Sequence, residues 1–349
     1  MKKNSYERDS NYELLRILAG MAIVVLHFNY HPNGGGALVV ATGANYYFLL
    51  VLEVACACAV NVFILISGYF GCNSSTIKFG KLAELLLQTI CFSLAFYLIY
   101  CIKQGDISLR STIASMIPAN YFVILYIALM CVAPFINKLL ALLTTRQFKV
   151  LVIVLLVVFS GYPTLVDVFK EITGNEWNGL STIGLEGSMR GYSIVNFVLL
   201  YILGAWIRKD GTLSECKVRT LLVSLLGIIA IVVAWRSILP QTAWMYCNPL
   251  IIVEAMIVFV LFGKIQVTSR TINRFASAAF TCFLVQSKLL EPIVGIAEEV
   301  ESFPIMVLLL FGSIVSIYIV AYAAKELWKW LTKIPFRYTT ERIPSISID

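Results

Sequence analysis

The sequence predicts an all-α, polytopic membrane protein of about ten transmembrane helices. Of its 349 residues, 59% are hydrophobic and only 13% are charged, and the mean hydropathy is +0.85. Apolar runs of about 18 to 25 residues recur from end to end, which is the length that a membrane-spanning helix needs. These runs are continuous rather than alternating, which argues against a β-barrel. No polar stretch is long enough for a water-soluble catalytic domain, so we expect one transmembrane domain over residues 1–349.

Ten apolar runs define the expected helices. They lie near residues 12–30, 46–70, 80–102, 118–138, 147–165, 192–208, 218–236, 243–263, 275–295 and 303–330. The connections are short except 163–191, which is long, polar and rich in glycine. Long loops of this kind often carry function, which would make this one a lid or an acceptor-binding loop. The alternative is a passive connector.

The basic residues predict the orientation in the membrane. With the N-terminus inside, 20 of the 27 Lys and Arg residues fall on the inner segments, six fall on the outer side, and Arg16 lies within a span. This bias follows the positive-inside rule and predicts that both termini are cytoplasmic. The membrane that we expect is the cytoplasmic membrane of a bacterium. The net charge of +7 therefore indicates topology rather than nucleic-acid binding. The polar N-terminus lacks a cleavage site, so we expect the first helix to be retained.

The nine cysteines occur singly and form no CxxC pair. Most lie inside predicted spans, where a cysteine usually serves as a small apolar packing residue. The spacing of His27 and His31 would allow two metal ligands on one helix, but no motif places a third ligand. We therefore expect no metal.

The first span carries an arginine near its start and a histidine near its end. Arg16 and His27 are eleven residues apart, so they lie about 16 Å apart on nearly the same side of the helix. A guanidinium suits a phosphate or a carboxylate, and histidine is the usual general base near neutral pH. The alternatives are an Arg16 that reaches the lipid headgroups and a His27 that packs in the core. His31 precedes Pro32 and is interpreted as an interfacial loop residue.

Two glutamates in spans are candidates to orient the histidine. A carboxylate within hydrogen-bond distance would hold an imidazole in place and stabilise its protonated form. Glu53 lies at a depth similar to that of His27. Glu254 lies deeper, in a span interrupted at Asn248–Pro249. Either could be the partner of His27, and depth favours Glu53.

The inner half of the second span could receive a phosphorylated donor. Ser67 lies in this half, and Lys78 and Lys81 follow it near the predicted level of Arg16. Hydroxyls, loose backbone amides and lysines suit phosphate groups. The alternative is a polar turn followed by lysines that only set the topology.

Several motifs together resemble the acyltransferase family 3 membrane proteins, the O-acetyltransferase group that acts on surface polysaccharides. They are the Arg16–His27 spacing, NVFILISGYF at 61–70, YFVILYIALMCVAPFINKLL at 121–140 and FVLLYILGAWIRK at 197–209. The third has the Pro-Phe-x-Asn pattern and the last the Tyr-x-x-Gly pattern. The chain departs from the resemblance in the ninth span, where Phe283 and Gln286 stand where relatives often have Tyr-Leu-x-His.

The resemblance implies acyl transfer from cytoplasmic acyl-CoA, usually acetyl-CoA, to a hydroxyl of a carbohydrate or lipid-linked precursor. His27 falls on the essential histidine of the family and Arg16 on its first-span arginine. We therefore expect His27, oriented by Glu53, to act as general base or acyl relay.

The expected donor site contains Arg16 with Lys78 and Lys81 at the phosphates and Ser67 in the donor tunnel. The pantetheine arm is long enough to bridge the two ends of the first span. The alternatives are a transporter or exporter of a polysaccharide precursor, and an inactive scaffold. No nucleic-acid partner is expected.

Overall fold

The structure is a computed structural model that describes residues 9–105, 107–118, 120–175, 191–332 and 343–348. The chain divides into two compact units: Met1–Gly71 with Leu143–Tyr322, and Cys72–Leu142 with Ala323–Asp349. The expectation of one domain over residues 1–349 stays a prediction.

The first unit holds most of the helices and the candidate site. Its elements are α1 (Ser10–Asn29), α2 (Ala37–Val40), α3 (Gly43–Cys56), α4 (Ala59–Gly71), α8 (Thr145–Leu156), the π-helical turn η1 (Val157–Gly161), α9 (Tyr162–Thr173), α10 (Ile194–Asp210), α11 (Thr212–Glu215), α12 (Val218–Ile238), α13 (Pro249–Gly263), α14 (Arg270–Ala276), α15 (Ala279–Ala297) and most of α16 (Phe303–Thr332).

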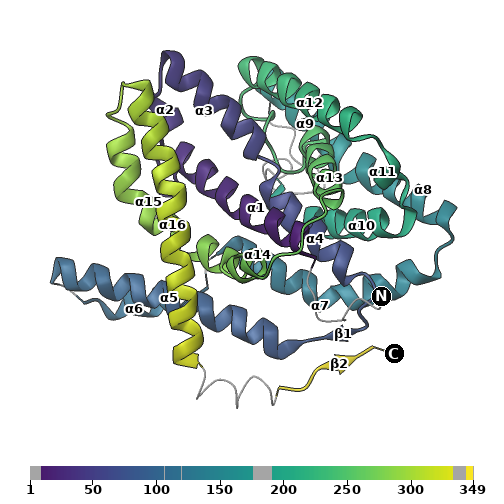
Figure 1. Cartoon of the computed structure of the whole chain (residues 1–349), viewed down its shortest axis with the longest axis horizontal. Coiled ribbons are helices and arrows are strands. Elements are labelled where there is room, and N and C mark those ends of the chain that lie inside the picture. The colour runs from purple at the N-terminus through teal and green to yellow at the C-terminus, as the bar shows by residue number, and fades with distance from the viewer. Residues whose placement is uncertain (1–8, 106, 119, 176–190, 333–342, 349) are drawn as a thin grey trace. The chain divides into compact units, whose positions relative to one another are not determined.

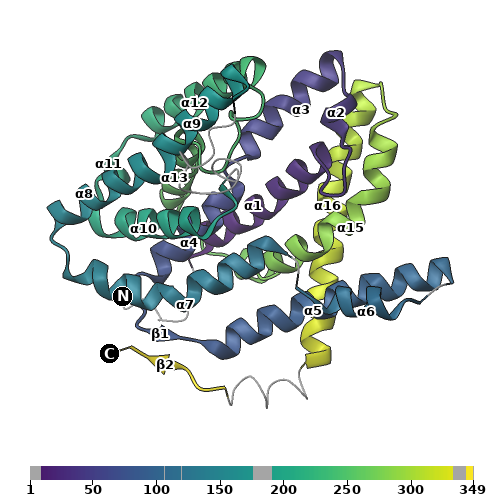
Figure 2. The same ribbon diagram turned by 180° about the vertical axis from the view of Figure 1, so that it is seen from behind.

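The second unit is smaller. Its elements are β1 (Thr76–Ile77), α5 (Phe79–Gln104), α6 (Leu109–Met116), α7 (Tyr121–Leu142), the last turns of α16 and β2 (Ile346–Ser347). The strands form one short antiparallel ladder. Figure 2 shows α7 running beside β1, and the Asn137 side chain donates to the Ser74 carbonyl oxygen at 2.8 Å. The asparagine of the Pro-Phe-x-Asn pattern thus holds the turn that precedes β1.

The all-α membrane fold is confirmed. Within the described residues, eight helical segments are long and apolar enough to cross a membrane. The remaining two predicted spans correspond to α10, with 17 residues, and α13, with 15 residues. The count of about ten therefore matches the helices, although two of them are short.

Two spans differ in detail from the prediction. The second is not one helix, because it breaks between α3 and α4 at Ala57–Cys58. The fifth continues through η1 into α9 and ends at Thr173, so the first part of the predicted 163–191 loop is helical. Charged residues in α9 make this segment look like a loop, whereas Pro163 near its start is compatible with a helix. Residues 176–190 of the loop lie outside the described part of the chain.

Helix α1, which carries Arg16 and His27, lies among other helices. It packs against α2, α3, α4, α13, α14 and α15, and Figure 1 shows it in dark purple among them. Its start is fixed by Asn11, whose side chain donates to the Phe262 carbonyl oxygen at 2.9 Å. One exposed position, Leu18 at 42%, marks the side of α1 that the other helices leave open.

Two glycines allow α4 and α10 to cross at very close range. A Cβ atom on Gly68 would clash with the Tyr201 carbonyl oxygen, and one on Gly204 would clash with the Leu65 carbonyl oxygen. Small residues at such crossings let helix backbones approach closely in membranes. The Ser-Gly-Tyr and Tyr-x-x-Gly motifs are therefore two sides of one helix contact.

The crossing yields a stability prediction. Gly204→Ala should destabilise the protein by about 1–3 kcal/mol or more, because the added methyl meets rigid backbone rather than a movable side chain. Gly227→Ala is the matched control, since a Cβ there meets nothing within 4 Å, and alanine is the better helix former. Thermal unfolding of the two variants in detergent measures the difference; an equal Tm for both would contradict the close crossing.

Candidate active site

The Arg16 and His27 side chains extend from the side of α1 that faces the other helices. Both are half-exposed, while the exposed Leu18 lies two residues from Arg16 and therefore about 200° around the helix from it. The uninterrupted helix from Ser10 to Asn29 keeps the predicted relation between the two side chains. Both residues thus keep some accessible surface on the packed side of α1.

Neighbouring residues show which helices border this face. Tyr12 and Gly20 lie one turn before and after Arg16, each about 40° to one side of it. The Tyr12 ring stacks on Phe259 of α13, with 4.8 Å between centroids. A Cβ on Gly20 would lie 3.9 Å from the Ala279 Cβ of α15. The face that carries Arg16 and His27 is thus bordered by α13 and α15.

His27 and His31 have different environments. The Nδ1 atom of His27 is buried and has no hydrogen-bond partner among the described residues. His31 is buried; its Nε2 donates to the Ser287 carbonyl oxygen at 2.8 Å, and its Nδ1 accepts from the Asn33 amide at 3.3 Å. These partners assign the neutral Nε2–H tautomer to His31. His31 thus holds the loop after α1 in place through two hydrogen bonds. His27 is the histidine whose Nδ1 has no partner among the described residues.

Arg16 has a carboxylate partner that the sequence reading overlooked. Its Nη1 lies 3.0 Å from Oε1 of Glu13, one turn earlier on α1, and the Arg16 side chain is 33% exposed. A guanidinium has five N–H donors, and this contact occupies few of them. Arg16 therefore remains able to bind an anion, although Glu13 reduces the local positive charge.

Glu53 is brought to Asn29 rather than to His27. The Asn29 amide donates to Oε2 of Glu53 at 2.9 Å and to the Leu49 carbonyl oxygen at 3.1 Å. Asn29 lies two residues after His27 and therefore about 200° around α1 from it. The depth of Glu53 matches the prediction, but its hydrogen bond joins α3 to the opposite side of α1.

Glu254 is the second buried carboxyl group. It is fully buried on α13, and neither carboxyl oxygen has a nitrogen or oxygen partner among the described residues. The Cys58 thiol lies beside it, at the break between α3 and α4. The predicted interruption at Asn248–Pro249 is the start of α13, where the Asn248 side chain accepts from the Leu250 amide at 2.9 Å.

The remaining candidate residues are spread over both units. Ser67 is half-buried on α4, and its hydroxyl donates to the Phe63 carbonyl oxygen at 3.0 Å. Lys78 and Lys81 are exposed at the beginning of α5, in the second unit. The first unit therefore brings together Arg16, His27 and Ser67.

Arg208 lies in an aromatic cluster near the start of α1. In the sequence, its charge indicates only the topology in the membrane. The Arg208 guanidinium lies 5.1 Å from the Tyr69 ring centroid, and its Nη1 donates to the Tyr69 carbonyl oxygen at 3.1 Å. The Tyr69 ring in turn contacts Tyr12, with 5.4 Å between centroids. A guanidinium beside aromatic rings suits a ligand that has both a planar ring and an anionic group, such as a nucleotide.

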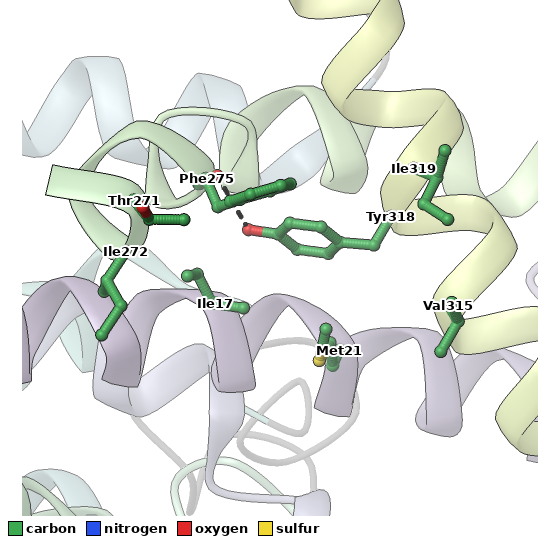
Figure 3. A pocket seen from close by; sticks show the side chains of 8 residues that line it. All are labelled: Ile17, Met21, Thr271, Ile272, Phe275, Val315, Tyr318 and Ile319. Carbon is green, nitrogen blue, oxygen red and sulfur yellow. Dashed lines mark hydrogen bonds between the residues drawn. The ribbon is translucent and has the colours of Figure 1, made fainter. Parts of the chain in front are cut away.

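A separate cavity of about 250 Å³ lies on another side of α1 (Figure 3). It is bordered by α1, α14 and α16, and the Tyr318 ring extends across it so that its hydroxyl donates to the Phe275 carbonyl oxygen at 3.2 Å. Its lining residues are Ile17, Met21, Thr271, Ile272, Phe275, Val315, Tyr318 and Ile319. The lining carries no charge, so this cavity does not suit a phosphate.

Comparison with known families assigns the chain. The family model for the acyltransferase domain matches residues 9–324. The chain belongs to acyltransferase family 3. The match covers nearly the whole chain, including α1 and most of α16, and it confirms the resemblance that the sequence motifs indicated. No curated protein and no solved structure matches. As a family 3 member with many apolar helices, the protein is a multi-pass membrane acyltransferase.

The Asn29–Glu53 contact gives a second prediction. Asn29→Ala should leave the buried Glu53 carboxyl without its donor and destabilise the protein by about 1–3 kcal/mol. Asn33→Ala is the control, because Asn33 makes an exposed contact of 3.3 Å to Glu291. Thermal unfolding measures both variants, and an unchanged Tm for Asn29→Ala would argue against the contact.

Proposed function

We propose that this acyltransferase moves an acyl group, acetyl in the first instance, from cytoplasmic acyl-CoA to a hydroxyl group. The acceptor is a carbohydrate or a lipid-linked precursor of a surface glycan. The orientation proposed is the one that the basic residues favour, with both termini in the cytoplasm of a bacterial cell.

One observation carries the proposal: a guanidinium and an imidazole share the protein-facing side of a single helix. Their separation of about 16 Å is close to the length of the pantetheine arm. The CoA phosphates can therefore stay near Arg16 while the thioester reaches His27. This spacing favours a two-ended donor over a small ion, and thus acyl transfer over the export alternative.

His27 supplies the base in this reaction. Its imidazole takes the proton of the acceptor hydroxyl as the oxygen attacks the thioester carbonyl carbon. The tetrahedral intermediate collapses when the carbon–sulfur bond breaks, and the imidazolium returns the proton to the leaving thiolate. The products are the acyl ester and free CoA. The same position would also allow His27 to carry the acyl group itself.

The donor phosphates are assigned to the end of α1 where Arg16 lies. Arg16 keeps free N–H donors beside Glu13, and Arg208 adds a second guanidinium within the Tyr69–Tyr12 aromatic cluster. Ser67 is kept as a donor-tunnel residue, and a phosphate-binding role for Lys78 and Lys81, which lie in the second unit, stays a prediction. Glu53 acts indirectly, by holding α3 to the end of α1 through Asn29.

His27 variants test the base. His27→Ala and His27→Gln should lower kcat for acyl transfer by about 10²–10⁴-fold, the usual contribution of a general base. The Tm of each variant is measured alongside kcat, so that loss of the base is separated from loss of the fold. The measurement is release of free CoA by purified protein with acetyl-CoA and a glycan acceptor. Full turnover in both variants would rule out the role of His27.

A truncated donor tests the role of Arg16. Arg16→Ala should raise KM for acetyl-CoA about tenfold to a hundredfold, which corresponds to one or two charge-assisted hydrogen bonds. The same variant should use acetyl-pantetheine as well as the wild type does, since that donor lacks the phosphates. Arg219→Ala is the control, because Arg219 is an exposed arginine on α12. A loss that is equal for both donors would contradict phosphate binding.

A further inference from the structure

Gln286 is a buried glutamine of α15. It is fully buried on α15, and neither its Oε1 nor its Nε2 has a hydrogen-bond partner among the described residues. A buried polar group without a partner costs about 1–3 kcal/mol. Such groups are rare in folded proteins and are often found at functional positions.

The packing of α1 on α15 places Gln286 opposite His27. The two helices touch where Gly20 meets Ala279, and they run in the same direction, because His31 meets Ser287 further along. His27 lies seven residues after Gly20, and Gln286 lies seven residues after Ala279. Seven residues are about two turns, so both side chains return to the contact side about 10 Å further along.

The unmade hydrogen bonds of the two residues are complementary. Nδ1 of His27 is buried and has no partner in the part of the chain that the structure describes, although the residue as a whole is partly exposed. An amide oxygen accepts one hydrogen bond from an imidazole N–H, and this bond selects the tautomer. A bond from His27 to Gln286 would thus satisfy a buried atom on each residue.

We propose that Gln286 is the positioning residue of His27. The bond is not formed in the structure; a change of the Gln286 side-chain rotamer brings its Oε1 to the Nδ1–H of the imidazole and leaves the Nε2 lone pair directed at the acceptor hydroxyl. This inference rests on the proposed acyl transfer, in which His27 is the base. It replaces Glu53 in that role, because Glu53 is bonded to Asn29 on the far side of α1.

Histidine-selective ¹⁵N NMR provides a direct test, because the chain has only two histidines. The His27→Gln spectrum assigns the signals. In the wild type, the ¹⁵N shifts of His27 should indicate the Nδ1–H tautomer. Gln286→Leu, of similar size but without the amide, should move the His27 signals toward the other tautomer and leave those of His31 in place. Gln88→Leu is the control, because Gln88 is a buried glutamine of α5.

Kinetics of the same variants complete the test. Gln286→Leu should lower kcat at least tenfold with an unchanged KM for acetyl-CoA, and Gln286→Glu, which restores an acceptor oxygen, should recover most of kcat. Unchanged His27 shifts and kcat in Gln286→Leu would overturn the inference. If His27→Gln abolishes transfer while Gln286→Leu does not, only the positioning role fails. If the wild type transfers no acyl group, the proposed function fails, and the NMR shifts still decide whether the two residues are bonded.

Discussion

The enclosure of α1 by other helices is the constraint on which the rest of the structure depends. An arginine and a histidine on an apolar helix are costly in contact with lipid, so such a helix must turn them toward other helices or water. Six neighbouring helices provide that cover, and the open side of α1 carries Leu18 instead. The close crossing of α4 and α10 at Gly68 and Gly204 belongs to the same arrangement, because α4 is one of the helices that cover α1.

Specific side chains provide hydrogen-bond partners for non-helical backbone in the first unit. Backbone groups at membrane depth need partners within the protein. Asn61 donates to the Tyr246 carbonyl oxygen at 2.8 Å, and Ser160 donates to the Cys247 carbonyl oxygen at 2.6 Å. Asn248 supports the same segment and caps α13. Polar residues of α4 and η1 therefore maintain the non-helical segment that precedes α13.

The sequence predicted what depends on local periodicity and missed what depends on packing. The ten helices and the shared side of Arg16 and His27 follow from composition and from about 100° of rotation per residue. The partner of Glu53 did not follow, because depth in the membrane gives the level of a side chain but not its direction. Charged residues concealed α9, and Glu13 was overlooked because a one-turn ion pair looks like an ordinary polar helix start. The proposed pairing of Gln286 with His27 rests on a contact between distant helices, at Gly20 and Ala279, which no single segment encodes.

The buried polar groups fall into two classes, and the difference between them locates the chemistry. Asn29 and Asn61 donate hydrogen bonds that join separate segments, and Asn248 donates within the loop that precedes α13. Among the described residues, Glu254 and Gln286 are a buried carboxyl and a buried amide without a nitrogen or oxygen partner, and the Cys58 thiol lies beside Glu254. They lie on α13 and α15, the two helices that border the His27 side of α1. A folded protein keeps such groups against their energetic cost where function requires them, so the unpartnered set indicates the reaction centre more directly than depth or charge does.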